Sequence, residues 1–222
     1  IPCSLSLLRH RSSLRAMDDD VSGLRVVITA GASGIGLATA EAFLAGGAQV
    51  EICDVDTDAL DRFRSEHGVA GAWHADVSDE IAVDLFVSGA VDVMGGVDVL
   101  VNNAGIAGPG GRTDTLELDD WNRTLDVNVT GTFLASRKVI PHLVAQRSGS
   151  IVNMSSTAGL MGFPNRAPYA ASKWAIIGLT KTMAMELGEF GVRVNAICPG
   201  SVDNERMDRV VELEADASGR PA

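Results

Sequence analysis

The chain has 222 residues, 46% of them hydrophobic and 21% charged, a composition typical of one globular domain with a buried core. Its formal charge of −11 and isoelectric point of about 4.7 exclude the basic face that nucleic acid or an anionic membrane requires, and no apolar run approaches the roughly 20 residues that span a bilayer. The acidic balance instead favours a small-molecule partner. The three cysteines are scattered without CxxC or Cys/His spacing, so we expect no disulfide framework, no metal site and a reducing compartment, the cytoplasm.

Residues 1–16 are rich in serine and arginine and contain no acid, which is the composition of an organelle transit peptide. The alternative is that Met17 is the start and the residues before it are leader sequence. Under both interpretations we expect residues 1–20 to be a disordered tail or leader and residues 21–222 to form a single domain.

From Leu24 onward, short runs rich in β-branched apolar residues alternate with longer patterns of helical periodicity. The runs predicted as strands are residues 25–30, 48–54, 71–75, 97–103, 149–155 and 192–198. Helices are predicted up to about Ala45, up to about His67, from Ser78, from about Trp121 to Gln146, and from about Tyr169 to Leu187. Strands that are apolar on both faces and separated by helices indicate a buried parallel sheet. The predicted fold class is therefore α/β, a doubly wound parallel sheet of the Rossmann type with helices on both faces.

The first predicted strand leads into a glycine-rich turn, TAGASGIG at residues 29–36, which opens the next helix. Small residues at a helix N-terminus let backbone N–H groups and the helix dipole approach a pyrophosphate. Glycine-rich loops occur for other reasons too, but here Asp54 ends the second strand about 20 residues later, where dinucleotide folds place a carboxylate on the adenosine ribose.

Asp54 has a second interpretation, as a solvated acid in a loop that contains several acids. We favour the ribose role, because no Lys or Arg lies at the glycine turn or just after Asp54 to meet a 2′-phosphate. The carboxylate would also repel that phosphate. The predicted cofactor is therefore NAD and not NADP.

Tyr169 is the only tyrosine of the chain, and Lys173 follows it in the stretch APYAASKWAI. Residues four apart on a helix share a face, so the polar ends of these two side chains approach one another. The pair is either an accident of the surface or a catalytic pair.

Five motifs lie in order on the predicted elements: TAGASGIG, NNAG at 102–105, IVNMSS at 151–156, YAASK at 169–173 and CPGSV at 198–202. Over about residues 21–215 the chain therefore resembles the short-chain dehydrogenase/reductase family in its common single-domain branch. The resemblance implies that residues 21–222 are an NAD-binding catalytic domain with an incomplete C-terminal end, because family members continue into another strand and part of a substrate lid.

The resemblance also implies a catalytic tetrad of Asn128, Ser156, Tyr169 and Lys173. Tyr169 would exchange the proton of the substrate oxygen, Ser156 would hydrogen-bond that oxygen, and Lys173 would stabilise the tyrosinate and bind the nicotinamide ribose. Asn128 would hold a water that completes the proton path. From local sequence alone, Asn128 reads as a packed or kink-forming residue in mid-helix and Ser156 as a turn residue.

Further cofactor contacts, through backbone or side chain, are implied at Gly31, Ser33, Gly34, Ile35, Gly36, Asp54, Asp76, Val77, Asn103, Tyr169, Lys173, Pro199 and Val202. Asp76 has a local alternative as a helix-capping acid. Ala30 departs from the family pattern, because the first glycine usually stands there; alanine resists positive φ, so we expect Gly31 to supply the permissive backbone. Asn204 replaces the usual threonine after Pro199, and its amide can still hydrogen-bond the nicotinamide.

The predicted function is hydride transfer between NAD(H) and a secondary alcohol or ketone. The alternative is a truncated dinucleotide-binding chain without turnover, since the sequence stops soon after the sixth strand. The pocket loops at 106–114 and 157–167 are mostly apolar, although Arg112 or Arg166 could meet an acid group on the substrate. We expect a homo-oligomer, a dimer or tetramer, when the chain is complete, and expect the chain as given to aggregate and to turn over poorly.

Overall fold

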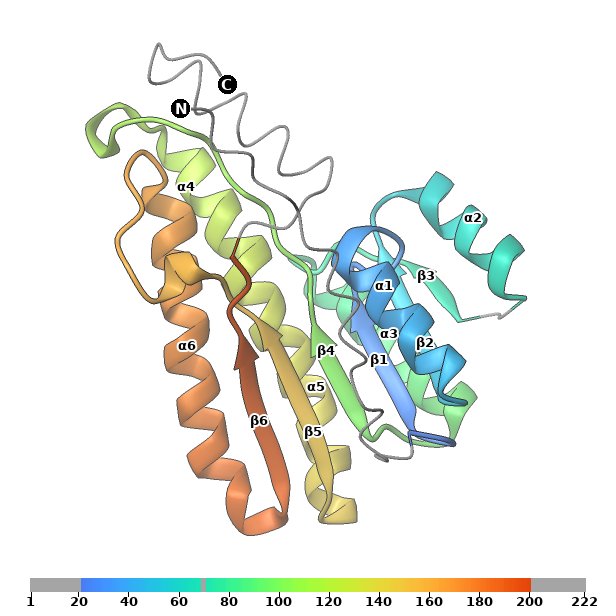
Figure 1. Cartoon of the computed structure of the whole chain (residues 1–222). Coiled ribbons are helices and arrows are strands. Elements are labelled where there is room, and N and C mark those ends of the chain that lie inside the picture. Colours follow the sequence, from blue (N-terminus) through green and yellow to red (C-terminus); the bar gives the residue numbers. More distant parts are fainter. Residues whose placement is uncertain (1–20, 69–70, 201–222) are drawn as a thin grey trace, which may run out of the picture.

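The computed structural model describes residues 21–68 and 71–200. They form a sheet of six parallel strands in the order β3-β2-β1-β4-β5-β6 (Figure 1). The strands are β1 (Arg25–Thr29), β2 (Gln49–Asp54), β3 (Ala72–His74), β4 (Val99–Asn102), β5 (Gly149–Met154) and β6 (Val192–Ile197). All six predicted strands are confirmed, each somewhat shorter than its sequence run. The strand order reverses between β1 and β4, and ligands of such sheets bind beyond the carboxyl ends of the strands at that switch point.

Helices cover both faces of the sheet, as predicted (Figure 1). The helices α1 (Gly34–Ala45) and α2 (Thr57–His67) belong to one hydrophobic cluster, and α3 (Glu80–Met94), α5 (Gly131–Gln146) and α6 (Ala167–Leu187) belong to the other. Neighbouring residues of β1 alternate between the two clusters: Val26 and Ile28 lie in the first and Val27 in the second. The central strand is therefore buried on both sides, which explains its continuous apolar sequence.

Aspartates set the starts of two helices. Asp56 caps α2 by accepting a hydrogen bond from the Ala59 N–H at 3.0 Å, and Asp79 caps α3 by accepting from the Ile81 N–H at 2.8 Å. The third helix therefore begins at Glu80, two residues after the predicted Ser78, because the cap at Asp79 fixes the first turn.

The long helix predicted over residues 121–146 is present but contains a wider turn. It runs as α4 (Leu118–Leu125), a π-helical turn (Asp126–Thr130) and α5. Asn128 lies in the middle of the π turn and is 1% exposed. π turns inside α-helices are frequent at functional sites.

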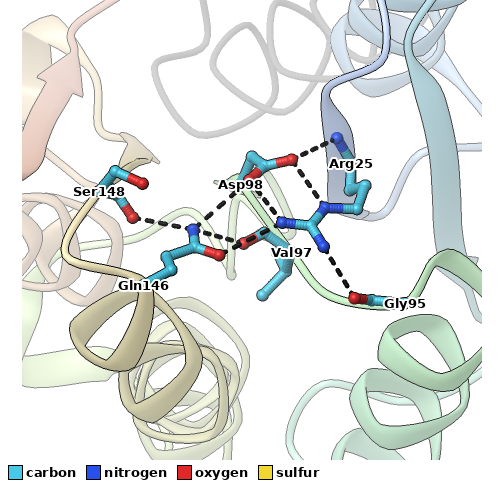
Figure 2. A network of polar contacts seen from close by, with 6 residues as sticks. All are labelled: Arg25, Gly95, Val97, Asp98, Gln146 and Ser148. Carbon is cyan, nitrogen blue, oxygen red and sulfur yellow. Dashed lines mark hydrogen bonds and ion pairs between the residues drawn. The ribbon is translucent and has the colours of Figure 1, made fainter.

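The amino ends of β1 and β4 are joined by a polar clamp, shown in Figure 2. The Asp98 carboxylate accepts hydrogen bonds from the Arg25 backbone N–H at 3.0 Å, from its Nε at 2.8 Å and from its Nη2 at 2.8 Å. Gln146, at the end of α5, donates to the carbonyls of Val97 and Ser148 and accepts from Arg25. This clamp lies at the end of the sheet opposite the ligand-binding edge, so it bears on stability.

Some predicted features lie outside the described residues. They are residues 1–20, Val202, Asn204 and the rest of the chain after Gly200. Among the described residues, no helix is long and apolar enough to cross a membrane.

Candidate active site

The glycine turn after β1 is strained at Ala30, which has a φ of 52°. The expectation that Gly31 would supply the permissive backbone is wrong: the left-handed conformation falls on Ala30 itself. Gly31 is needed for another reason, because a Cβ there would stand 2.6 Å from Ile52 Cγ2 on β2. The turn therefore carries backbone strain at one non-glycine residue, Ala30.

Gly34 and Gly36 shape the start of α1. Gly34 has a φ of 53°, and a Cβ on it would meet nothing within 4 Å, so its outer side is open. A Cβ on Gly36 would collide with the Ala30 carbonyl and stand 2.5 Å from Asn103 Nδ2. Asn103 donates from Nδ2 to the Ala30 carbonyl at 2.8 Å, which ties the turn to the end of β4. The exposed N-cap Ser33 makes no side-chain cap hydrogen bond, so the helix N-terminus presents its backbone N–H groups outward.

Asp54 ends β2 against this turn. Its side chain is nearly buried, with 9% exposure, and Oδ2 accepts a hydrogen bond from the Ala32 N–H at 3.2 Å. Oδ1 accepts from the Val55 N–H at 2.8 Å. The interpretation of Asp54 as a solvated loop acid is therefore wrong, because the carboxylate is fixed beside the glycine turn.

Asp76 lies in the loop after β3 and is not the cap of α3, which is Asp79. Its Oδ1 accepts from the Ser78 N–H at 2.9 Å and from the Ser78 hydroxyl at 2.7 Å, and its Oδ2 accepts from Arg123 at 2.9 Å. Burial alone would raise the pKa of Asp76, but the hydrogen bonds from Ser78 and Arg123 outweigh it and lower that pKa. The group is therefore held as a carboxylate.

Tyr169 and Lys173 face one another on the first turns of α6. The Lys173 Nζ lies 5.7 Å from the centroid of the Tyr169 ring and donates a hydrogen bond to the Met154 carbonyl at 2.7 Å. Lys173 is 4% exposed, whereas Tyr169 is partly exposed. The pair therefore sets a buried lysine amine beside a partly exposed tyrosine ring.

Ser156 lies two residues after the end of β5, and its Oγ accepts a hydrogen bond from the Ala158 N–H at 3.2 Å. The turn-capping interpretation is thus confirmed, and the hydroxyl proton remains available for another acceptor. Ser155 has a different contact: its buried hydroxyl donates to the Lys173 carbonyl at 2.9 Å and holds α6 against the end of β5.

Asn128 joins the π turn to two other segments. Its Oδ1 accepts from the Ile106 N–H at 2.7 Å, and its Nδ2 donates to the Ile106 carbonyl at 3.0 Å and to the Ser172 hydroxyl at 2.9 Å. A methyl group on Gly105 would stand 3.2 Å from Asn128 Oδ1 and 3.3 Å from Lys173 Nζ. Asn128 is therefore the packed polar residue that local sequence indicates, and it also lies beside Lys173.

The two arginines of the pocket loops differ in environment. Arg112 is exposed and paired with Asp114 at 3.1 Å, with side chains 77% and 65% exposed. Arg166 is 2% exposed, and its guanidinium carbon lies 6.0 Å from the centroid of the Tyr169 ring. Asn165, beside it, has a φ of 60° and accepts a hydrogen bond from the Gly111 N–H, which joins the two pocket loops at this point. Of the two arginines, Arg166 is the one beside Tyr169.

The remaining predicted cofactor residues lie around the same edge of the sheet. The Pro199 carbonyl accepts from the Thr157 N–H at 3.0 Å, and Ile35 is partly buried in the first turn of α1. Sequence reasoning missed Arg123, Ser172 and Thr29, whose Oγ1 accepts from the N–H groups of Asn103 and Ala104. These three residues form hydrogen bonds with residues far away in sequence, and no local sequence pattern predicts such contacts.

Comparisons with known proteins agree with this architecture. A family model described as "short chain dehydrogenase" matches residues 25–215. The chain is 44% identical over 172 residues to an "Inactive 2-(S)-hydroxypropyl-CoM dehydrogenase 2" of Xanthobacter autotrophicus, a match that covers 77% of this chain and 74% of that protein. It is 41% identical over 196 residues to a trans-4-hydroxycyclohexanecarboxylate dehydrogenase of Sinomonas cyclohexanicum, covering 84% of this chain and 75% of the relative. Among solved structures, NAD⁺-bound xylitol dehydrogenase superposes with a TM-score of 0.84 and 37% identity, covering 89% of this chain and 78% of that one.

Proposed function

The chain belongs to the short-chain dehydrogenase family, and we propose that it transfers hydride between NAD(H) and a secondary alcohol or ketone, with Tyr169 as the general acid or base. The observation that carries the proposal is the Tyr169–Lys173 pair, which lies at the carboxyl edge of the sheet with the Lys173 Nζ 5.7 Å from the tyrosine ring. Asn128 and Ser156 come to the same edge from two other segments.

The residues at the switch point fit a nicotinamide dinucleotide. The open side of Gly34 and the outward N–H groups of α1 suit a pyrophosphate, and the fixed carboxylate of Asp54 suits a ribose diol. When bound, the oxidised nicotinamide supplies the acceptor for hydride. We assign NAD and not NADP because Asp54 would oppose a 2′-phosphate, and the NAD⁺-bound xylitol dehydrogenase is consistent with this choice.

In the proposed oxidation, Tyr169 takes the proton of the substrate hydroxyl while the carbinol carbon loses hydride; in reduction, Tyr169 returns the proton to the carbonyl oxygen. Lys173 stabilises the tyrosinate, and the Met154 carbonyl fixes the ammonium in place. The Ser156 hydroxyl donates to the substrate oxygen and limits its charge. Asn128 holds the water that connects Lys173 to solvent.

The substrate class is a mostly apolar alcohol or ketone, because Leu160, Met161 and Phe163 are exposed in the loop before Arg166. Of the two arginines in the pocket loops, we assign Arg166, beside the Tyr169 ring, to an acid group on such a substrate. The trans-4-hydroxycyclohexanecarboxylate of the Sinomonas relative's name combines both features, a ring alcohol and a carboxylate. We also propose a cytoplasmic location and a homo-oligomeric assembly.

A second candidate function, dinucleotide binding without turnover, is favoured by the word "inactive" in the name of the Xanthobacter relative. One experiment separates the two. The purified chain is incubated with NAD⁺ and a panel of secondary alcohols, with and without an acid group, and NADH formation and NADH binding are both measured. Turnover that disappears in Tyr169→Phe supports the dehydrogenase, whereas NADH binding without turnover of any panel member supports the binder.

A further inference from the structure

We propose that Arg123 is a positioning residue for the adenine end of the cofactor site: it acts through Asp76, without touching substrate or the reacting atoms. This inference rests on the proposed function, because it takes Asp76 as a cofactor contact. It adds a residue from α4, far from the predicted cofactor motifs, to the machinery that selects the dinucleotide.

Arg123, Asp76 and Ser78 form a closed ring of hydrogen bonds. Arg123 Nη2 donates to Asp76 Oδ2 at 2.9 Å, and Arg123 Nη1 donates to the Ser78 hydroxyl at 2.7 Å. That hydroxyl donates in turn to Asp76 Oδ1 at 2.7 Å. The two carboxylate oxygens are thus held from two directions, so the plane of the carboxylate is fixed before a ligand arrives.

The ring also decides which acceptor position is left for a ligand. A carboxylate has about four acceptor positions, two on each oxygen. Oδ1 accepts from the Ser78 N–H and hydroxyl, and Oδ2 accepts from Arg123. The remaining position, on Oδ2, is fixed by Arg123 and matches a single N–H donor such as the exocyclic amino group of adenine.

The charge of Arg123 matters because this edge of the sheet carries two carboxylates. Asp54 and Asp76 lie close enough to buried Cys53 that their charges both contribute to raising the pKa of its thiol, although burial is the main cause. Two carboxylates around one adenosine site repel each other, and the Arg123 guanidinium compensates one of them.

The π turn and α5, which follow α4 directly, hold further residues beside the proposed site. Asn128 lies five positions later in the π turn and binds Ile106. Gly131 begins α5, and a Cβ on it would stand 2.7 Å from Val77 Cγ2, so the helix and the 76–78 loop pack without space for a side chain. Arg123 and Gly131 therefore hold the 76–78 loop against the segment that carries Asn128.

The test compares Arg123→Met with Arg137→Met. Arg137 lies on α5, beyond the π turn that follows α4. It is paired with Glu80 and has the same 51% side-chain exposure as Arg123, which makes it a matched control. Binding of NADH and of reduced nicotinamide mononucleotide, which lacks the adenosine half, is measured by nicotinamide fluorescence. Thermal unfolding of each variant is recorded in parallel.

We expect Arg123→Met to raise the Kd for NADH by about three- to tenfold, the effect of losing one half-exposed charged contact, and to leave the Kd for the mononucleotide within about twofold. Arg137→Met should change neither Kd, and Arg123→Lys should restore part of the NADH affinity. Equal weakening for both ligands, or an unchanged Kd for NADH, would overturn the inference while leaving the proposed function intact. Failure of the parent protein to bind NADH would overturn the proposed function, and this inference with it.

Discussion

Lys173 lies one helical turn beyond Tyr169, and its buried Nζ is held 5.7 Å from the tyrosine ring by a 2.7 Å hydrogen bond to the Met154 carbonyl. The contact with Met154 belongs to β5, so the strand and not the flexible lysine chain sets where the ammonium lies. Arg166 lies on the same ring, 6.0 Å from its centroid. Two buried cationic side chains therefore flank one partly exposed tyrosine ring.

Tyr169→Phe tests the proposed acid–base role directly. The variant removes only the ionisable oxygen, so we expect NADH binding to be retained and kcat to fall by about 10²- to 10⁴-fold, the usual contribution of such a group. Trp174→Phe, a half-exposed neighbour on α6, is the control and should leave kcat unchanged. If Tyr169→Phe keeps more than half of the parent kcat, the assignment is wrong.

The fold was predictable because each strand carries its own pattern. The middle of β1 is apolar, since the structure buries Val26, Val27 and Ile28 completely, and a helix lies between each strand and the next at the expected spacing. The pair Tyr169–Lys173 was predictable for the same reason: their contact is local, one helical turn, and needs no tertiary information.

Contacts between distant segments were not predictable. The ring that links Arg123 to Asp76 joins residues 47 positions apart, and Asn128 in the π turn binds Ile106 and Ser172, which lie 22 and 44 positions away. The sequence-based prediction put the left-handed backbone at Gly31, whereas the structure has it at Ala30. The actual need for glycine at position 31, the close approach of Ile52, is visible only once β1 and β2 are paired.

Asp54→Ala is expected to change cofactor choice. The parent should favour NAD strongly over NADP, since in the proposed site the Asp54 carboxylate would pair with a ribose diol and repel a 2′-phosphate. The variant should raise KM for NAD and lower KM for NADP, as measured by initial rates with each cofactor. Asp54 also accepts a hydrogen bond from the Ala32 N–H, so its loss could disrupt the glycine turn itself. Thermal unfolding of the variant distinguishes a disrupted turn from a changed preference between NAD and NADP. A parent that uses both cofactors equally well contradicts the argument.

Ala30→Gly should stabilise the protein. A left-handed alanine destabilises the folded state by about 1–2 kcal/mol. Glycine removes this strain, but its greater freedom in the unfolded chain lowers stability by about 0.4–1 kcal/mol. We therefore expect the free energy of unfolding to rise by up to about 1 kcal/mol in urea titration. Ala42→Gly, at an exposed position inside α1, is the control and should lower it by about 1 kcal/mol. A loss of stability in Ala30→Gly would show that the φ of 52° carries no strain.

Arg166→Met should discriminate between substrates. If Arg166 meets an acid group, kcat/KM for a hydroxy acid should fall by about tenfold or more, the effect of losing a charge-assisted hydrogen bond, while kcat/KM for the matching methyl ester stays within about twofold. Arg112→Met should affect neither substrate, because Arg112 is exposed and paired with Asp114. An equal fall for acid and ester would assign Arg166 a role in holding Tyr169 instead.

Asp98→Asn should lower stability in a pH-dependent way. The hydrogen bond from Arg25 is the main cause that holds the pKa of Asp98 below its ordinary value of 3.8, and the clamp in Figure 2 is made by the carboxylate form. The carboxylate therefore contributes its full stability above about pH 5, and this contribution is lost as the pH falls through the folded-state pKa. Near neutral pH we expect Asp98→Asn to reduce the free energy of unfolding by about 1–3 kcal/mol.

The variant should also flatten the acid limb of the stability curve. Asp76, whose pKa is lowered too, titrates in both proteins, so only the difference between parent and Asp98→Asn reports on the clamp. That difference should shrink as the pH is lowered from about 5 towards 3, because the parent then loses the same charge. Asp114→Asn is the control, because the Asp114 side chain is 65% exposed in its pair with Arg112. Its free energy of unfolding should stay within about 0.5 kcal/mol of the parent value. Parallel stability curves for the parent and Asp98→Asn would mean that the charge of Asp98 contributes nothing and that packing alone joins β1 to β4.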